Sequence, residues 1–246
     1  MLPLIGEPAP QFKAVTTMGP VNFPSDYKGK WVILFSHPAD FTPVCTTEIS
    51  KFAAMREDFQ ALNTEVIGLS VDSVPSHKAW LMDIDQLKLY GSKTKVWFPI
   101  IEDIKMSVSK KYGMIHPAVS DTSAVRAVFF IDPKGILRAM IYYPKSLGRN
   151  FAEIKRVIQA LQKADQDKCS TPADWKPGMD VIAPGAQSKA TRRTQVRPGE
   201  VYAPRWYVPF RREGPLKDAA PAARAAAKKA PAKKTAEKKV SEKKKL

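Results

Sequence analysis

Cysteine and long hydrophobic runs are scarce in this sequence of 246 residues, and each shortage excludes a class of protein. With two cysteines the chain cannot be a small secreted protein held together by several disulfides, and it cannot form a four-cysteine zinc site. Apolar runs such as Trp31–Phe35 and Ala127–Ile131 fall far short of the ~20 residues of a membrane-spanning helix. The N-terminus has no basic stretch followed by an apolar one, so no secretory signal is expected. These absences predict a soluble protein of a reducing compartment, the cytoplasm, without a membrane partner.

Positive charge is abundant, but most of it lies near the C-terminus. The sequence has 40 Lys and Arg residues against 24 Asp and Glu residues, a formal net charge of +16. Residues 217–246 contribute +8, residues 185–216 contribute +5 and residues 1–184 contribute only +3. Because residues 217–246 consist mainly of Ala, Lys and Pro, they are expected to form a disordered tail. Two interpretations stay open for this tail: binding of nucleic acid through phosphate contacts, and a solvated segment with no partner.

Hydrophobic runs of strand length alternate with helical patterns over residues 1–168. Strands are predicted at Trp31–Phe35, Glu65–Val71, Ala127–Ile131 and Leu137–Tyr143, with a turn at Asp132–Gly135. Helices are predicted at about Pro43–Leu62, Ser76–Leu89 and Ile104–Tyr112, and around Ile154, Val157, Ile158 and Leu161, which have the spacing of a core-facing stripe. This order predicts an α/β fold with a mixed central sheet flanked by helices. Frequent prolines predict that residues 169–216 form an extended C-terminal arm and not a second compact core.

Cys45 lies at the predicted start of a helix. Thr42 is a good N-cap and Pro43 suits the first helical position, so Cys45 falls in the first turn. Backbone N–H groups there lack partners within the helix, and the helix dipole is positive at this end, so both favour a thiolate. The Thr42 hydroxyl could face the sulfur, and Glu48 could reach back to the backbone at the helix start. The alternative is a buried, inert cysteine.

The segment around Cys45 resembles the active-site signature of the peroxiredoxins. The signature reads P-x-x-x-T-x-x-C, from Pro38 through Thr42 to Cys45, and the string SHPADFTPVCTTE is similar to the version of the one-cysteine subfamily of the AhpC/TSA type. Further similar blocks follow in the same order: FPII at 98–101, YGM at 112–114, AVRAVFFIDPKG at 124–135, YYPKSLGRNFAEI at 142–154, TPADWKPG at 171–178 and, more weakly, RWYVPF at 205–210. The resemblance covers roughly Leu4 to Val181.

The resemblance implies a thioredoxin-like fold and a thiol-specific peroxidase. The Cys45 thiolate would attack the terminal oxygen of hydrogen peroxide or an organic hydroperoxide and become a sulfenic acid, releasing water or an alcohol. Thr42 would hydrogen-bond the peroxide, and Pro38 would shield the thiolate. Arg126 would stabilise the thiolate and the charge that develops on the O–O bond. From the residues alone, an arginine at the start of a hydrophobic strand is more often an edge charge, and only the motif gives Arg126 this role.

Three further residues are implied to support the pocket: His37, Glu48 and Arg149. His37 is also interpretable as a structural histidine that binds the backbone. His77 and His116 are scattered in the sequence, so no metal site is predicted. No cofactor is expected, because a thiolate reduces a peroxide without a prosthetic group.

Cys169 departs from the pattern of the two-cysteine members. Their resolving cysteine lies in a V-C-P block, whereas here Pro172 is preceded by Thr171 and Cys169 lies two residues further upstream. Cys169 is therefore a bystander, a resolving thiol or a site for a partner thiol. We favour a one-cysteine mechanism, in which an external thiol of the thioredoxin or glutathione type reduces the sulfenic acid.

The resemblance also bears on assembly and on other activities. It implies a homodimer, with a decamer as an alternative, in which the arm of one chain reaches toward the active site of the other. Some one-cysteine members have a phospholipase activity attributed to a serine in a G-x-S-x-G element; the corresponding stretch here, Tyr27–Trp31, has no serine, so this activity is not expected. The competing function is that of a nucleic-acid-binding protein acting through residues 217–246.

Overall fold

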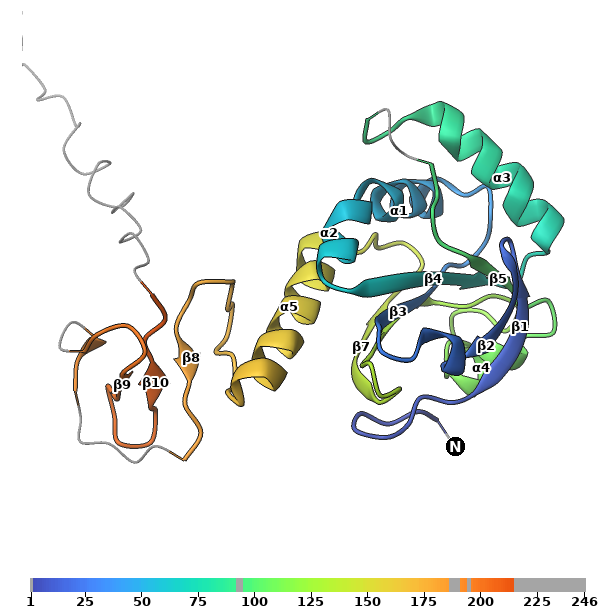
Figure 1. The fold of residues 1–246 in the computed structure, drawn as a ribbon. Helices are drawn as coiled ribbons and strands as arrows, with labels where there is room; N and C mark the ends of the chain where they lie inside the picture. The colour runs from blue at the N-terminus through green and yellow to red at the C-terminus, as the bar shows by residue number, and fades with distance from the viewer. Residues whose placement is uncertain (1, 92–94, 186–190, 194–195, 215–246) are drawn as a thin grey trace, which may run out of the picture. The chain divides into compact units, whose positions relative to one another are not determined.

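The computed structural model describes residues 2–91, 95–185, 191–193 and 196–214 (Figure 1). The chain divides into two compact units. The first comprises Met1–Cys169 with Trp175–Pro177, and the second comprises Ser170–Asp174 with Gly178–Leu246. The predicted basic tail, residues 217–246, lies outside the described residues. No helix in the described part of the chain is long and apolar enough to cross a membrane.

A seven-stranded mixed sheet with the order β2-β1-β5-β4-β3-β6-β7 forms the centre of the first unit. Its strands are β1 (Phe12–Thr16), β2 (Gly19–Phe23), β3 (Trp31–Ser36), β4 (Thr64–Ser70), β5 (Ile100–Glu102), β6 (Arg126–Ile131) and β7 (Leu137–Tyr143). β3 and β5 run parallel to β4, whereas β6 runs antiparallel to both β3 and β7. The prediction of a mixed α/β fold is therefore confirmed.

The four predicted strands correspond to β3, β4, β6 and β7, and the predicted turn closes with a hydrogen bond from Gly135 N to Asp132 O (2.8 Å). The prediction missed β1, β2 and β5. Gly, Pro and Asn interrupt the apolar pattern of β2, and β5 has only three residues, so neither shows the run of apolar residues that marks a buried strand. Their strand conformation comes from pairing with neighbours.

Five α-helices are present in the described residues of the first unit. They are α1 (Pro43–Ala54), α2 (Arg56–Ala61), α3 (Val74–Leu87), α4 (Ser107–Lys111) and α5 (Phe151–Asp167). The prediction of one helix over Pro43–Leu62 is wrong at Met55, where the backbone leaves helical angles (φ −95°, ψ 20°). Met55 is buried in the core. The break between the two helices therefore lies at a packed residue, and the apolar pattern of the sequence does not show it.

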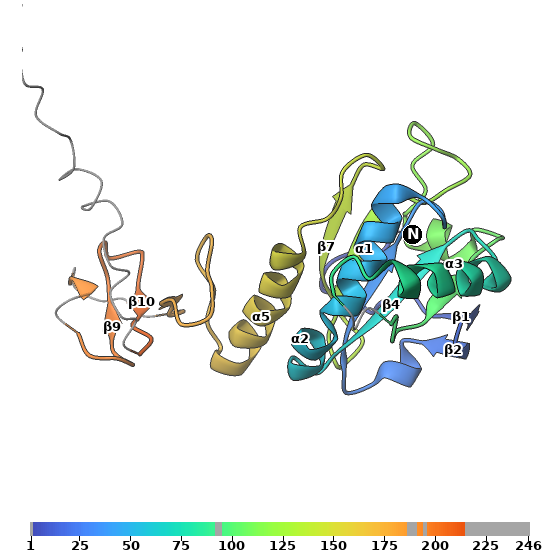
Figure 2. The same ribbon diagram turned by 90° about the horizontal axis from the view of Figure 1, so that it is seen from above.

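The sheet separates two hydrophobic clusters because successive strand side chains point to opposite faces. In β3, Ile33 and Phe35 join the cluster that α1, α3 and α5 cover, whereas Val32 and Leu34 join the cluster that α4 covers. Figures 1 and 2 show α1 and α3 on the same side of the sheet. The first cluster contains Cys45, so the helix that carries this cysteine is fixed against the sheet by the main core.

The end of β3 lies beside the start of β6. In the antiparallel register Phe35 pairs with Val128, which is two residues after Arg126. The Ser36 hydroxyl donates to Val125 O (2.6 Å) and accepts from Ala127 N (3.0 Å), which joins the two strand ends. This junction brings the start of β6 to the segment that connects β3 with α1.

The second unit contains a small antiparallel sheet with the order β8-β10-β9, formed by β8 (Val181–Ile182), β9 (Val201–Tyr202) and β10 (Phe210–Arg211). The Asp180 carboxylate accepts hydrogen bonds from Arg193, from the Tyr202 hydroxyl (2.9 Å) and from Glu213 N (3.2 Å). The described residues of the predicted arm therefore include a small sheet of two-residue strands, which the proline content does not reveal. Asp180, which is partly buried, joins its segments through these hydrogen bonds.

Candidate active site

Cys45 occupies the position that the sequence predicts. Thr42 has extended angles at the N-cap, Pro43 is the first residue of α1 and Cys45 is the third. The side chain of Cys45 is fully buried. The Thr42 hydroxyl donates to Ala39 O (2.9 Å), so it caps the preceding loop and makes no side-chain bond to the helix start.

Arg126 meets Cys45 from β6. Its Nη1 donates to Cys45 Sγ at 3.3 Å and to Glu48 Oε2 at 2.7 Å. Nε and Nη2 both donate to Lys145 O, at 2.9 and 2.7 Å, so the guanidinium is held from two sides. Arg126 is 3% exposed, which rules out the interpretation of an edge charge and leaves a cation directed at the sulfur.

Glu48 connects Arg126 to a second buried arginine, Arg149. Glu48 Oε2 accepts from Arg149 Nη1 (2.6 Å), and Oε1 accepts from Arg149 N (2.9 Å). Arg149 Nη2 donates to Ser36 O and to Ala127 O (3.0 Å), at the strand junction described above. The expectation that Glu48 reaches back to the helix-start backbone is wrong. Its carboxylate, one turn after Cys45, binds the two guanidinium groups instead.

These four side chains form a charge cluster, here defined as Cys45, Glu48, Arg126 and Arg149. Burial lowers the pKa of Arg149 to about 10, so this arginine is still a cation at neutral pH. Two cations and one carboxylate leave one positive charge, and an unbalanced charge is costly in a buried site. A thiolate at Cys45 balances it, whereas a neutral thiol does not. The cluster therefore surrounds the sulfur of Cys45 with a net positive charge.

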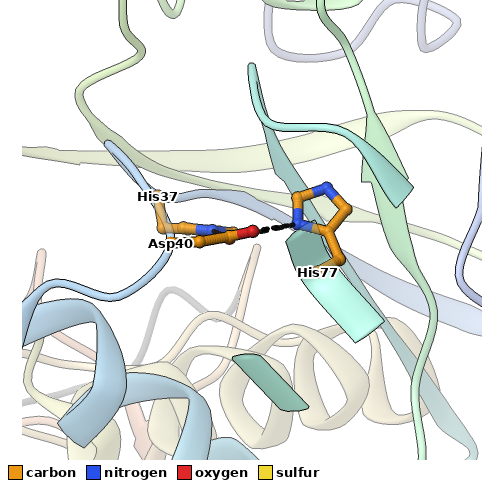
Figure 3. A group of neighbouring side chains, drawn as sticks. All are labelled: His37, Asp40 and His77. Atoms are coloured by element: carbon orange, nitrogen blue, oxygen red, sulfur yellow. Dashed lines mark hydrogen bonds and ion pairs between the residues drawn. The ribbon is translucent and has the colours of Figure 1, made fainter. Parts of the chain in front are cut away.

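The loop between β3 and α1 holds a second polar group, drawn in Figure 3: His37, Asp40 and His77. Asp40 Oδ1 faces His37 Nε2 at 2.9 Å, and Asp40 Oδ2 faces His77 Nδ1 at 2.8 Å. His77 comes from α3, and its Nε2 lies 3.1 Å from Ile101 O on β5. Both histidine rings are fully buried. The interpretation of His77 as a scattered histidine is wrong, because the fold brings it to Asp40.

The ionisation of this group follows from its surroundings. Burial raises the pKa of Asp40, but the hydrogen bonds from His37 and His77 outweigh burial and hold that pKa well below its usual range. Burial lowers the pKa of His37, so His37 is neutral at neutral pH. Imidazole and carboxylate can ligate metals, and ligand atoms of the three residues lie within 4.8 Å of one another. His37 Nε2, His77 Nδ1 and the Asp40 carboxylate oxygens already contact one another, whereas His37 Nδ1 has no hydrogen-bond partner among the described residues.

Sequence reasoning missed Asp40 and His77 as members of the site. The available signal was the spacing of His77, Trp80 and Ile84, which places all three on one face of α3, and all three are buried. That spacing identifies a core-facing histidine but not its partner, since Asp40 lies 37 residues earlier in the chain.

Cys169 lies just after α5. Its side chain is buried, and its Sγ is 3.8 Å from Lys163 O in the last turns of that helix. Neither Cys45 nor Cys169 forms a disulfide in the structure. Pro38 is buried in the loop that precedes Cys45. The structure thus brings Arg126, Glu48 and Arg149 together with Cys45, whereas Thr42 and His37 bond within the preceding loop and Cys169 lies just after α5.

A thioredoxin-like sheet with a buried cysteine at a helix N-terminus, faced by an arginine, defines a thiol-based redox enzyme. Comparison with known families narrows this class. Residues 5–140 match the AhpC/TSA family, and residues 160–194 match the C-terminal domain of 1-Cys peroxiredoxin. The chain belongs to the AhpC/TSA family of peroxiredoxins and is a thiol-dependent peroxidase.

Curated relatives and solved structures agree with this assignment. A peroxiredoxin of Methanosarcina mazei is 60% identical over 189 residues, covering 76% of this chain and 86% of the relative. One of Aquifex aeolicus is 60% identical over 176 residues, covering 72% and 78%. The crystal structure of a cysteine-to-serine mutant of peroxiredoxin 6 of Arenicola marina has a TM-score of 0.73 and 35% identity, covering 85% of this chain and 98% of that one. A yeast mitochondrial 1-Cys peroxiredoxin has a TM-score of 0.72 and 40% identity, covering 86% and 99%.

Proposed function

We propose that Cys45 reduces hydrogen peroxide and small organic hydroperoxides, and that an external thiol then reduces Cys45. The observation that carries this proposal is the contact of 3.3 Å between Arg126 Nη1 and Cys45 Sγ within a buried charge cluster that a thiolate balances. Such a thiolate is preformed as the nucleophile. The same guanidinium can bind the oxygen atoms of an arriving peroxide.

The oxidation step balances as a nucleophilic displacement. The Cys45 thiolate donates an electron pair to the terminal oxygen of ROOH, an S–O bond forms and the O–O bond breaks. The products are a Cys45 sulfenic acid and RO⁻, which takes up a proton to give water when R is hydrogen or an alcohol otherwise. Arg126 faces the developing negative charge. Thr42, whose hydroxyl proton is given to Ala39 O, offers its oxygen lone pairs to the O–H of the peroxide.

Re-reduction requires two thiols. One external thiol attacks the sulfenic sulfur and displaces water, forming a mixed disulfide with Cys45. A second thiol then releases the Cys45 thiol and leaves an external disulfide. The match of residues 160–194 to the C-terminal domain of 1-Cys peroxiredoxin supports this route. The yeast relative is described as resolving its thiol through glutathione/thioredoxin systems, which supports a donor of the same type here.

The remaining features of the proposal concern surroundings and assembly. Pro38 narrows the approach to Cys45, while His37 orders the loop that contains it. The chain works as a cytoplasmic antioxidant homodimer in cell redox homeostasis, with a decamer as the larger alternative. Of the aromatic arm residues Trp175, Trp206, Tyr207 and Phe210, Trp206 and Tyr207 are well exposed and support a contact with a second copy, whereas Trp175 is buried.

Replacement of the nucleophile tests the proposal. Cys45→Ser should abolish consumption of hydrogen peroxide in the presence of thioredoxin or glutathione, because a serine hydroxyl is not ionised at neutral pH. Cys169→Ser is the matched control, since it removes the other thiol and should retain the wild-type rate. Peroxide consumption by Cys45→Ser at the wild-type rate would refute the proposed function.

Mass spectrometry separates the one-cysteine route from a route that uses Cys169. After one equivalent of peroxide without added thiol, the protein should gain one oxygen atom on Cys45, trapped as a sulfenic acid adduct. A disulfide between Cys45 and Cys169, within one chain or between two chains, would instead establish Cys169 as the resolving thiol.

A further inference from the structure

Phe41 gives the loop before Cys45 an unusual backbone. Its φ is +53°, in the left-handed region that bulky residues seldom adopt, and its ring is 59% exposed. Burial of the Phe41 side chain therefore does not explain this conformation. The next residue is Thr42, which begins α1, so the turn at Phe41 sets the direction in which the chain enters the helix. Contacts on neighbouring residues must hold the turn in place.

Asp40, immediately before Phe41, provides most of those contacts. Its backbone N–H donates to Asp72 Oδ2 at 3.0 Å. Its carboxylate accepts from His37 Nε2 (2.9 Å), from Ser76 Oγ (2.8 Å) and from His77 Nδ1 (2.8 Å). Two of these donors, Ser76 and His77, belong to α3. The loop between β3 and α1 is therefore anchored to a helix that comes later in the chain.

His77 is the donor that connects Asp40 to the sheet. Both of its ring nitrogens face oxygens that can only accept: the ionised Asp40 carboxylate on one side and the Ile101 carbonyl, at 3.1 Å, on the other. The ring is therefore a bridge between the loop and β5. His37 has a single partner on Asp40, and its Nδ1 has no hydrogen-bond partner among the described residues. The bridge therefore depends on His77.

We propose that His77 is a positioning residue for peroxide reduction: through Asp40 it holds the strained turn at Phe41 and so places Thr42 beside the sulfur of Cys45. This inference rests on the proposed function and adds a residue to it. Among the described residues, the side-chain hydrogen bonds of His77 go to Asp40 and to Ile101 O and not to the charge cluster. His77 affects the position of the Thr42 hydroxyl oxygen. The contacts of Arg126 with Cys45 and Glu48, which balance the charge of a thiolate, come from other elements.

Charged and titratable groups surround the bridge on several elements. Asp40 and Asp72 face it from the loops after β3 and β4, His37 from the β3 end, and Glu102 binds Val74 N at the start of α3 (2.8 Å). A neutral side chain of similar shape that still donates to Asp40 should therefore substitute for His77 in part.

Three substitutions of His77 test the inference. The amide nitrogen of His77→Asn takes roughly the place of Nδ1 and can still donate to Asp40. The amide of His77→Gln takes roughly the place of Nε2, so it keeps a donor near Ile101 O but loses the bond to Asp40. His77→Leu loses both. The gel-filtered, fully reduced protein is used throughout, at a temperature where each variant is folded by circular dichroism.

Two rate constants are measured for each variant by stopped flow: oxidation of Cys45 by hydrogen peroxide, and alkylation of Cys45 by iodoacetamide. Peroxide oxidation requires Thr42 in place, whereas alkylation reports the reactivity of the thiolate alone. We expect His77→Gln and His77→Leu to lose about 10- to 100-fold in the peroxide rate, as small misplacements of a reacting group do. The alkylation rate should stay within about threefold of wild type in all three. His77→Asn should recover most of the peroxide rate.

Several results would overturn the inference. Wild-type peroxide rates in both His77→Gln and His77→Leu would remove any positioning role. Equal losses in the peroxide and alkylation rates would indicate a general structural role. If His77→Leu does not fold, the comparison of His77→Asn with His77→Gln decides, and equal rates for these two would contradict the role of Asp40. Wild-type protein without Cys45-dependent peroxide consumption would refute the proposed function itself, a result distinguishable from all of these.

Discussion

At the residue scale, the site depends on charge balance inside the core. Arg126 and Arg149 are both buried, and Glu48 binds each of them within 2.7 Å. Buried ion pairs contribute little net stability by themselves, but removal of one partner leaves an uncompensated charge. Each member of the charge cluster therefore affects both the reactivity of Cys45 and the stability of the fold.

Glu48→Gln tests the balance. The substitution leaves two buried guanidinium groups with only the thiolate to oppose them, so we expect the free energy of unfolding to fall by about 3–5 kcal/mol. Urea denaturation of the reduced protein measures this. Glu153→Gln is the control, since it removes a partly exposed carboxylate paired with Arg156 (2.6 Å) and should change stability by less than about 1 kcal/mol. Similar losses in the two variants would contradict the argument.

Arg126→Lys tests whether the guanidinium group must donate to several acceptors at once. A lysine keeps the charge but cannot donate to Cys45, Glu48 and Lys145 O together, so the charge is no longer directed at the sulfur. The rate constant for peroxide oxidation of Cys45 should fall by about 100- to 1000-fold, the usual loss for one preorganised donor. Arg138→Lys, at the partly exposed pair with Asp165, should leave that rate unchanged. A fully active Arg126→Lys protein would show that charge alone suffices.

At the scale of elements, the loop between β3 and α1 determines how the site responds to acid. This loop contains His37 and Asp40, both buried. His37 has a pKa below its ordinary value of 6.5, and Asp40 has one below its ordinary value of 3.8. In both cases the unfolded chain binds a proton at a higher pH than the folded chain does. Acidification therefore favours the unfolded state, first through His37 and then through Asp40.

The expected result is a free energy of unfolding that decreases as pH falls below about 6.5, and decreases more steeply below about 4, where carboxylates such as Asp40 and Asp165 take up protons in the unfolded chain. Urea denaturation at a series of pH values measures this dependence. His37→Asn should flatten the part of the curve between pH 7 and 5, whereas His116→Asn, at an exposed histidine, should not. An unchanged slope in His37→Asn would contradict the role of His37.

The helices and strands show which structural features can be predicted from local sequence. Continuous apolar runs mark β3, β4 and β6 because strands buried on both faces need them, whereas β7 is a partly exposed edge strand that follows a turn. The N-cap Thr42 and the following Pro43 mark the start of α1, and hence the place of Cys45, because capping is a local property. By contrast, β1, β2 and β5 depend on pairing partners, and the break at Met55 occurs where that residue packs into the core.

At the scale of the whole molecule, function is concentrated in the first unit. The charge cluster and the His37–Asp40–His77 group lie in residues 37–149. Most of the net charge of +16 belongs to residues after 184. The formal charge of the protein therefore describes its C-terminal region and not its peroxidase site.

Truncation after residue 216 tests this separation. Because no residue of the site is removed, the peroxide oxidation rate of Cys45 should equal that of the full chain. Retention on immobilised DNA at low salt, with release as salt increases, is the result expected if residues 217–246 bind phosphates, and it should disappear on truncation. Equal retention of the two proteins would exclude a nucleic-acid role for these residues, and a slower peroxide reaction would contradict the separation.

By itself the sequence determined the α/β order and the helix start that holds Cys45. Through the P-x-x-x-T-x-x-C signature it also determined the chemistry of the cysteine. Strand runs, caps and motifs each consist of contiguous residues, so they can be recognised without the fold. Only the tertiary structure decided which side chains meet it. Glu48 binds two arginines and not the backbone at the helix start. His77, which looks isolated in the sequence, contacts Asp40. These contacts join residues that are 37 to 101 positions apart, so sheet register and helix packing, not local pattern, set them.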